Sequence, residues 1–178
     1  MPRPSVLRLP DPCLVVLIGA AGAGKSTLAA RLFPPESILS SDAFRAVVSG
    51  DAADQRATRT AFSILHRQLE RRMAGRHTTV IDATSVTSYA RRSLVRRAAA
   101  QGIPVVAIVL DLDIDVVLAQ NAGRSGRIVP EAVVRRHVAD LARSLRPGAL
   151  DREGFAVIHR IRTPAGLDGL TIGWFGRG

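Results

Sequence analysis

Several residue types are scarce in this chain of 178 residues, and their scarcity excludes whole classes of protein. A single cysteine, Cys13, excludes an internal disulfide framework and a cysteine-rich metal site. Aromatic residues make up only 4% of the chain, which disfavours a surface that stacks single-stranded bases. The apolar run CLVVLIGAAGAG is too short to span a membrane, and the start, MPRPSVLRLPDP, lacks a signal-peptide core. We therefore expect a cytoplasmic protein without a membrane partner.

Lysine is equally scarce, because Lys25 is the only lysine among 25 Lys and Arg residues. The formal net charge of +10 suits a polyanionic partner such as nucleic acid. A GC-rich genome would also enrich a chain in arginine, so the charge alone leaves the partner open. The question is why one position keeps a lysine.

Apolar segments that resemble strands alternate with amphipathic segments that resemble helices. The expected strands are Leu14–Gly19, Ser37–Ser40, Thr78–Asp82, Val105–Asp111 and Phe155–Ile161. They are short and apolar on both faces, which is typical of a buried parallel sheet. Helices are expected at 54–73, where apolar residues recur at helical spacing, and at 91–101, before Gly102. This alternation predicts one α/β domain.

The lone lysine lies in the stretch IGAAGAGKST, which fits the pattern G-x-x-x-x-G-K-[ST] between a strand and a helix. Glycines let backbone N–H groups approach phosphate oxygens, and the following helix N-terminus adds positive potential. A compact ammonium fits this loop where a planar guanidinium does not. The sequence therefore predicts that ATP and Mg²⁺ bind here, with Ser26 as the Mg²⁺ ligand. The predicted phosphate-binding residues are Gly19, Ala20, Ala21, Gly22, Ala23, Gly24, Lys25, Ser26 and Thr27.

A second element, SSDAFR, follows the expected strand at 37–40. Ser41 is the expected N-cap of a helix, and Asp42 and Arg45 project from one face of it. The carboxyl end of this strand lies beside the phosphate loop in such a sheet, so Asp42 could accept a proton from an attacking hydroxyl. Arg45 could hold a phosphate of the acceptor. Alternatively, Asp42 only complements the helix dipole and pairs with Arg45.

Two further segments offer charged or polar groups near the expected site. Asp82 ends a strand and precedes Thr84, where it could order Mg²⁺, water or an arginine, or cap Thr84. The segment QNAGRSGRIVP, at 120–130, joins two helical segments and places Arg124 and Arg127 three residues apart. We expect it to form a lid whose arginines stabilise charge on the transferred group, the alternative being a solvated basic loop.

These segments resemble the kinase domain of bacterial polynucleotide kinase–phosphatase, over roughly residues 12–162. The resemblance is carried by LVVLIGAAGAGKST, SSDAFRAVVSGDAADQ, VIDATS and the pattern N-x-x-R-x-x-R-x-V-P at 121–130. It implies transfer of the γ-phosphate of ATP to 5′-hydroxyl ends of DNA or RNA. The chain departs from the family at Ser85, where asparagine is common, and before Asn121, where an arginine is common. Counterparts of the family's phosphatase and adenylyltransferase modules are missing.

The resemblance also implies roles for individual residues. Asp42 would activate the 5′-hydroxyl and Arg45 would contact the 3′-phosphate of the acceptor nucleotide. The candidate catalytic residues are Lys25, Asp42, Arg124 and Arg127, the candidate acceptor-binding residues are Asp42, Arg45, Asp82 and Thr84, and both arginines are expected to hold ATP phosphates.

The sequence thus predicts an α/β P-loop kinase fold with a mostly parallel five-stranded sheet, helices on both faces and an arginine-bearing lid. We expect an irregular leader at 1–12, a kinase domain at 13–165 and a tail at 166–178. The expected activity is that of an ATP- and Mg²⁺-dependent polynucleotide 5′-hydroxyl kinase. Alternatives are a kinase for a hydroxyl of a small molecule or nucleoside-like metabolite, and a non-catalytic ATP-binding module. The oligomeric state stays open.

Overall fold

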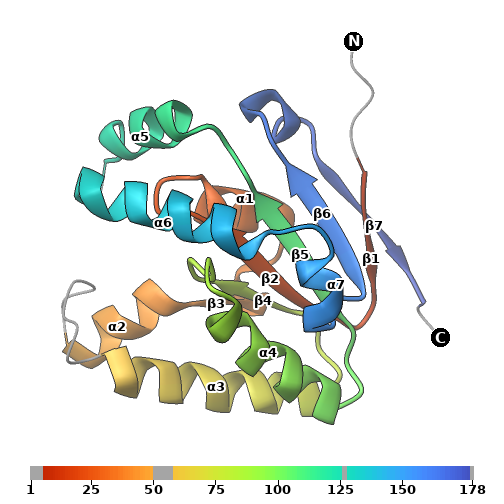
Figure 1. Cartoon of the computed structure of the whole chain (residues 1–178). Coiled ribbons are helices and arrows are strands. Elements are labelled where there is room, and N and C mark those ends of the chain that lie inside the picture. The colour runs from red at the N-terminus through yellow and green to blue at the C-terminus, as the bar shows by residue number, and fades with distance from the viewer. Residues whose placement is uncertain (1–5, 50–57, 126–127, 177–178) are drawn as a thin grey trace.

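The computed structural model describes residues 6–49, 58–125 and 128–176, and the structural statements below refer to these residues. Its strands are β1 (Val6–Pro10), β2 (Leu14–Gly19), β3 (Ile38–Ser40), β4 (Thr79–Asp82), β5 (Val105–Leu110), β6 (Val157–Ile161) and β7 (Thr171–Phe175). Five of them form a parallel sheet in the order β3-β4-β2-β5-β6 (Figure 1). The predicted sheet is therefore confirmed.

Helices cover both faces of this sheet, as the sequence predicts (Figure 1). They are α1 (Lys25–Leu32), α2 (Ser41–Ser49), α3 (Thr58–Ala74), α4 (Ser88–Ala100), α5 (Ile114–Ala122), α6 (Glu131–Ser144) and α7 (Ala149–Glu153). Within the described residues, none of these helices combines the length and the apolar content that a membrane crossing needs.

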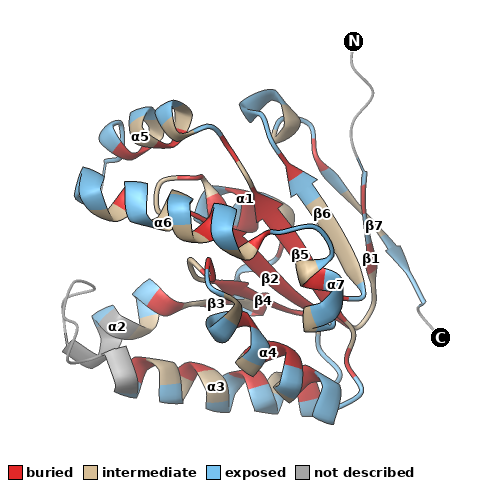
Figure 2. Cartoon of the chain, viewed as in Figure 1, coloured by how far each residue is buried: buried red, intermediate tan, exposed pale blue. Residues whose placement is uncertain are grey.

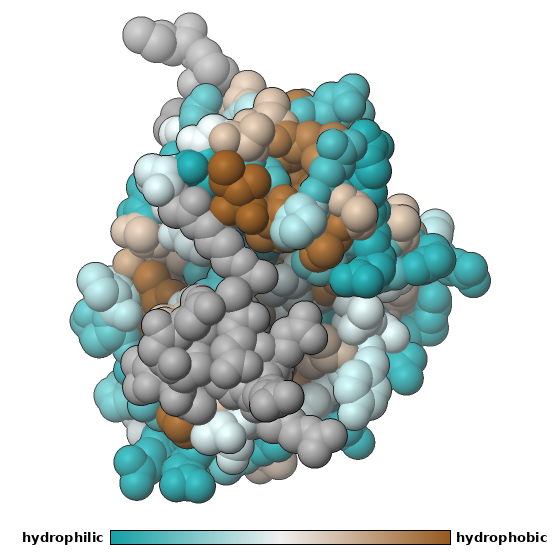
Figure 3. Space-filling model, turned by 90° about the vertical axis from the view of Figure 1, so that its left-hand side faces the viewer, coloured by the Kyte–Doolittle hydropathy of each residue, from teal (hydrophilic) through white to brown (hydrophobic). Residues whose placement is uncertain are grey.

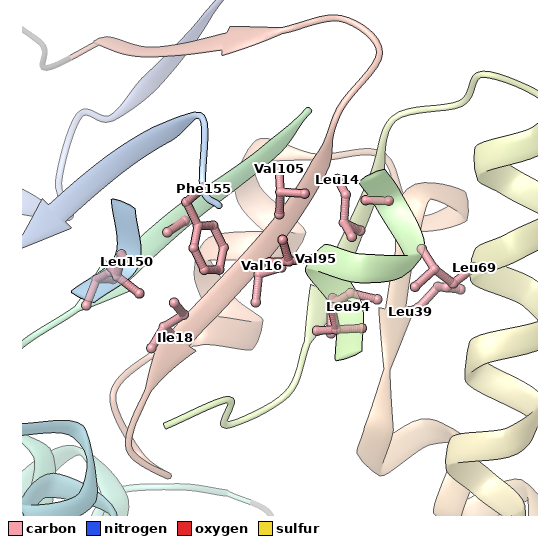
Figure 4. Packing of buried hydrophobic residues seen from close by; sticks show 14 of the residues in the cluster. Leu14, Val16, Ile18, Leu39, Leu69, Leu94, Val95, Val105, Leu150 and Phe155 are labelled. Carbon is pink, nitrogen blue, oxygen red and sulfur yellow. The ribbon is translucent and has the colours of Figure 1, made fainter. Parts of the chain in front are cut away.

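Two hydrophobic cores form because side chains alternate along each strand. In β2, Leu14, Val16 and Ile18 pack toward α3, α4 and α7, whereas Val15 and Leu17 pack toward α1 and α5. The central strands are accordingly buried along their length (Figure 2). Figure 4 shows the first core, where residues of α4 lie against Val16 of β2. A strand buried on both faces explains the nearly continuous apolar run of β2 in the sequence.

Both ends of the chain contain strands that the sequence analysis did not expect. Val6–Pro10, within the expected irregular leader, form β1, which pairs in parallel with β7. Leu7 and Leu9 of β1 alternate with exposed residues and are buried in the same core as α1. Proline-rich flanks hide this short alternation, although Pro10 is tolerated because it ends the strand. The leader is therefore not wholly irregular.

The parallel arrangement gathers three loops at one edge of the large sheet. The carboxyl ends of β2, β3 and β4 lie together there, since these strands are neighbours with the same direction. Ligands of open α/β sheets bind at this edge. The fold therefore places the phosphate loop, the start of α2 and the end of β4 around one site.

Candidate active site

The loop between β2 and α1 has a backbone that requires glycine. Gly22 and Gly24 both have φ angles of 89°, in the left-handed region that other residues rarely adopt. A Cβ atom on Gly22 would also lie 2.8 Å from the Cβ of Asn121 and 3.0 Å from the carbonyl oxygen of Val117. The loop therefore packs directly against α5. Because Gly24 carries no side chain to cap α1, the N–H groups of its first turn suit an anion.

Lys25 follows this loop as the first residue of α1 and is only 8% exposed. Its Nζ donates hydrogen bonds to the carbonyl oxygens of Gly19, at 2.9 Å, and Ala20, at 2.8 Å. Burial lowers the pKa of Lys25 to about 8, while the carboxylate of Asp82 raises it and Arg124 lowers it further. A compact ammonium with several donors satisfies two closely spaced carbonyls, which fits the choice of lysine here.

The end of β4 forms the next wall of the site. Asp82 is buried and acts electrostatically on Lys25. The carbonyl oxygen of Thr84 accepts the N–H of Gly19 at 3.1 Å, which ties the loop after β4 to the start of the phosphate loop. Ser85 follows with a φ of 48°, so the backbone turns sharply here. This hydrogen bond thus fixes the position of the loop after Asp82 relative to the phosphate loop.

Asp42 lies in the first turn of α2, directly after β3. The hydroxyl of Ser40 accepts the N–H of Ala43 at 3.4 Å, so Ser40 takes the capping role that the sequence analysis assigns to Ser41. The helix begins one residue earlier than expected, which explains this correction. The side chain of Asp42 is exposed and borders the same cavity as the phosphate loop.

A cavity of about 770 Å³ brings the predicted groups together. Its lining includes the predicted site residues Ala21, Gly22, Gly24, Lys25, Ser26, Thr27, Asp42, Asp82, Thr84 and Arg124. Gly19, Ala20 and Ala23, also predicted to bind phosphate, do not line the cavity, and the side chains of both alanines are buried in the core that includes α1. The side chain of Arg45 and the whole of Arg127 lie outside the described residues.

The expected lid is fastened at its base by one side chain. Asn121 is buried, and its Nδ2 donates to the carbonyl oxygen of Val129 at 2.8 Å. Its Oδ1 accepts the N–H of the same residue at 3.1 Å. This double hydrogen bond joins the end of α5 to the segment before α6. Arg124, between these points, is exposed and borders the cavity.

Several residues that were not predicted from the sequence also border the cavity, among them Gln120, Arg136 and His137. His137 is half-buried on α6, and its Nδ1 accepts the N–H of Ala21 at 3.4 Å. A signal was present, because residue 137 lies on the helical stripe defined by the buried Val134 and Leu141.

Magnesium fits the oxygen groups of this site. The hydroxyl of Ser26 and the carboxylate of Asp82 both border the cavity beside Lys25. Mg²⁺ usually takes only one or two protein oxygens and fills its other positions with phosphate oxygens and water. Across residues 6–49, 58–125 and 128–176, no group of three or more His, Cys, Asp or Glu side chains is placed to hold a metal. The pair therefore suits a Mg²⁺ ion that arrives with a triphosphate.

Figure 3 shows the molecule from the side of α2, α5 and α6. Hydrophobic side chains gather in its upper half and are bordered by hydrophilic ones. Ile128, after the lid, is 58% exposed, while Arg124 and Arg136 are exposed and border the cavity. Arg124 and Arg136 therefore offer exposed cationic side chains to a ligand in the cavity.

The family of the chain follows from a match over most of its length. A family model described as an AAA domain, AAA_33, matches residues 14–147. The chain therefore belongs to this family, and its five-stranded parallel sheet flanked by helices is the P-loop kinase fold. Membership in this class of kinases implies ATP binding. None of the curated proteins compared with the chain matches it.

Solved structures with the same fold come from kinases and from a repair complex. A chain of the Pnkp1/Rnl/Hen1 RNA repair complex gives a TM-score of 0.66 at 20% identity, over 81% of this chain and 47% of that one. A sugar kinase from a Janibacter species gives a TM-score of 0.57 at 19% identity, over 88% of this chain and 90% of that one. A gluconokinase from Sinorhizobium meliloti gives a TM-score of 0.54 at 16% identity, over 89% of this chain and 93% of that one. The chain thus spans about half of the first protein, and these similarities show the fold.

Proposed function

We propose that this P-loop kinase is a polynucleotide 5′-hydroxyl kinase that transfers the γ-phosphate of ATP to 5′-hydroxyl ends of DNA or RNA. One observation carries the proposal: Asp42, after β3, borders the same cavity as Lys25 and the phosphate loop after β2. A general base and a phosphate-binding loop on one cavity are the minimum that phosphoryl transfer to a hydroxyl requires.

In the proposed mechanism, the carboxylate of Asp42 orients the acceptor hydroxyl and takes its proton. The acceptor oxygen then bonds to the γ-phosphorus while the bond from that phosphorus to the bridging oxygen breaks, and ADP leaves. Lys25 and Arg124 stabilise negative charge on the transferred group, and Arg127 is assigned the same role. Mg²⁺, held by Ser26 and Asp82, would neutralise phosphate charge. Positioning and charge contribute most of the rate because the transition state is loose.

The acceptor assignment is supported by the residues around Asp42 and by the lid. The SSDAFR element and the 121–130 segment, in this order and at these spacings, match the polynucleotide kinase pattern. Arg45 is three residues beyond Asp42 and is assigned to a phosphate of the acceptor strand, and Thr84, which lines the cavity, is assigned to acceptor binding. The net charge of +10 and the fold similarity to a chain of an RNA repair complex agree with a nucleic-acid substrate.

A small-molecule kinase is the second candidate, because of how much of each known structure the chain covers. It covers 90% of the sugar kinase and 93% of the gluconokinase, but 47% of the repair-complex chain. Both of those kinases therefore match this chain in extent as well as in fold. In this case Asp42 would activate a hydroxyl of a metabolite.

A label-transfer screen tests the proposal. The chain is incubated with Mg²⁺, ATP labelled at the γ-phosphate, and one acceptor from a panel of DNA and RNA oligonucleotides with 5′-hydroxyl ends, nucleoside 3′-phosphates, hexoses and gluconate. We expect label on the 5′-hydroxyl oligonucleotides and none on matched oligonucleotides with 5′-phosphate ends. Label on a sugar acid or hexose alone would support the second candidate. ATP binding without transfer to any acceptor would contradict both.

A further inference from the structure

His137 occupies a position that the proposed mechanism does not use. It lies on α6, the helix after the lid, yet its Nδ1 accepts the N–H of Ala21 in the phosphate loop at 3.4 Å. The imidazole is half-buried and borders the same cavity as Lys25 and Asp42. A backbone donor of the phosphate loop is thus engaged by a side chain that lies 116 residues away in sequence.

The ammonium of Lys25, the other main hydrogen-bond donor of this site, also has acceptors within the protein. The Nζ of Lys25 donates to the carbonyl oxygens of Gly19 and Ala20. The ammonium and the N–H of Ala21 therefore both have acceptors within the protein. A triphosphate that binds this loop must compete with these acceptors for the same donors. The carbonyl oxygen of Ala20 keeps the N–H of Ala23 as a donor at 3.2 Å, whereas the displaced imidazole remains beside the incoming anion.

We propose that His137 is a phosphate-binding residue that exchanges one hydrogen-bonding role for another when a triphosphate enters the loop. The N–H of Ala21 passes from His137 to a phosphate oxygen. Nδ1 of His137 then takes one proton from solvent and donates it in a hydrogen bond to the phosphate. No other bond forms or breaks. The inference rests on the triphosphate binding of the proposed function and does not depend on the acceptor.

The charges around His137 favour this exchange. Burial lowers the pKa of His137, Lys25 on α1 and Arg136 lower it further, and Asp140 on α6 raises it. Arg124 in the lid acts on Lys25 and adds positive charge to the same region. The imidazole is therefore neutral in the unliganded protein near neutral pH, as an acceptor must be. A triphosphate brings several negative charges next to it, and these raise the pKa of the imidazole.

The direction of the pH dependence follows from these two states. Above the pKa of His137 in the complex, the imidazole is neutral with or without ligand, so it adds no pH dependence. Between the pKa values of the complex and of the free protein, binding takes up a proton, and affinity rises as pH falls. Below the lower pKa both states are protonated and the effect is complete. A single proton gives at most about a tenfold change in affinity per pH unit.

Calorimetric titration measures this proton directly. The wild-type chain and His137→Asn are titrated with Mg²⁺ and the non-hydrolysable ATP analogue AMP-PNP, in buffers that differ in ionisation enthalpy. Asparagine offers an oxygen near the place of Nδ1 that can accept the N–H of Ala21, but it cannot take up a proton. Protons released by the nucleotide itself are equal in both titrations, so the difference between them reports residue 137.

We expect the wild-type chain to take up more protons than His137→Asn near neutral pH, with the difference disappearing at higher pH. The matched control is His66→Asn on α3. Burial lowers the pKa of His66, Arg97 lowers it further and Glu70 raises it, but this histidine does not border the cavity. This control should behave like wild type. Histidine ¹⁵N NMR on the unmutated chain gives a second readout: the Nδ1 of His137 should be unprotonated in the free protein and protonated in the complex.

The outcomes separate this inference from the proposed function. Equal proton uptake by wild type and His137→Asn, with both binding AMP-PNP, overturns the role of His137 and leaves the kinase proposal intact. An Nδ1 that stays unprotonated in the complex does the same, even if the variant fails to fold. A wild-type chain that binds no triphosphate overturns the donor assignment and this inference together.

Discussion

Gly22 and Gly24 share a left-handed backbone but differ in their surroundings. A Cβ on Gly22 would approach the backbone and side chain of α5, whereas a Cβ on Gly24 would meet nothing within 4 Å. Strain in the backbone costs each alanine variant about 1–2 kcal/mol. At Gly22 the clash with α5 should add about 1–3 kcal/mol. The phosphate loop is therefore constrained both by its conformation and by its packing.

We predict that Gly22→Ala lowers the free energy of unfolding more than Gly24→Ala does. Urea unfolding of both variants measures the difference. Gly123→Ala is the reference, because Gly123 has a φ of −82° and its nearest neighbour would lie 3.6 Å from the added Cβ. Equal losses at Gly22 and Gly24 would mean that α5 does not support the loop as described.

The buried ammonium of Lys25 makes stability depend on pH. Burial lowers the pKa of Lys25 from 10.5 to about 8 in the folded chain. Between these values the unfolded chain binds a proton that the folded chain does not, so the free energy of unfolding rises with pH across this window. The rise is on the order of 3 kcal/mol at most, since each pKa unit corresponds to about 1.4 kcal/mol.

We predict that Lys25→Met removes this rise. Urea unfolding at pH 8 and pH 10 compares the variant with wild type. Burial also raises the pKa of Cys13 to about 12, which acts in the opposite direction but equally in both proteins. The difference between the two pH slopes therefore belongs to Lys25. Parallel slopes for the two proteins would contradict the buried, partly neutralised ammonium.

At the scale of elements, Arg91 of α4 joins three helices to the loop after β4. It is fully buried, and its Nε and Nη2 donate to the two carboxylate oxygens of Glu153 at 2.7 Å each. Its Nη1 donates to the carbonyl oxygen of Ser85 at 3.0 Å and to the hydroxyl of Ser144 at 3.2 Å. The loop that carries Thr84 is thereby held against α6 and α7.

Removing Arg91 should leave a buried carboxylate and a buried carbonyl without their donor. We predict that Arg91→Met lowers the free energy of unfolding by about 3–5 kcal/mol, as for other broken buried pairs. The matched control is Arg135→Met on α6, which breaks the exposed ion pair with Glu131 and should cost about 1 kcal/mol or less. Chemical denaturation of both variants provides the measurement. Similar losses would show that the buried network does not hold the loop.

Local patterns predicted the elements that depend on neighbouring residues. The phosphate loop follows from glycine spacing between a strand and a helix, and the central strands follow from continuous apolar runs. The β1–β7 pairing could not be seen, because its partners lie at opposite ends of the chain. Arg91 resembled the surface arginines around it, since nothing nearby identifies Glu153 as its partner. The helical stripe of α6 indicates that His137 faces the protein, but its contact with Ala21, 116 residues away in sequence, could not be seen.

The whole molecule carries a formal charge of +10, which bears on the choice of acceptor. A polynucleotide that binds a protein of this charge releases counterions. For single strands, a plot of the logarithm of affinity against the logarithm of salt concentration has a slope of about −0.7 for each neutralised phosphate. We predict that the KM for a long 5′-hydroxyl oligonucleotide rises steeply with KCl. The KM for a nucleoside 3′-phosphate, the matched short acceptor, should rise much less. Equal salt dependence for both would show that the strand beyond the acceptor nucleotide makes no ionic contacts with the protein.

The central claim is that Asp42 activates the acceptor hydroxyl beside a bound triphosphate. The most direct test measures single-turnover transfer of labelled γ-phosphate to a 5′-hydroxyl oligonucleotide by wild type and Asp42→Asn. The affinity of both proteins for AMP-PNP is measured alongside. We expect transfer by the variant to fall by about 10²–10⁴-fold, as for loss of a general base, while its nucleotide affinity stays as in wild type. Transfer by Asp42→Asn at close to the wild-type rate would contradict it.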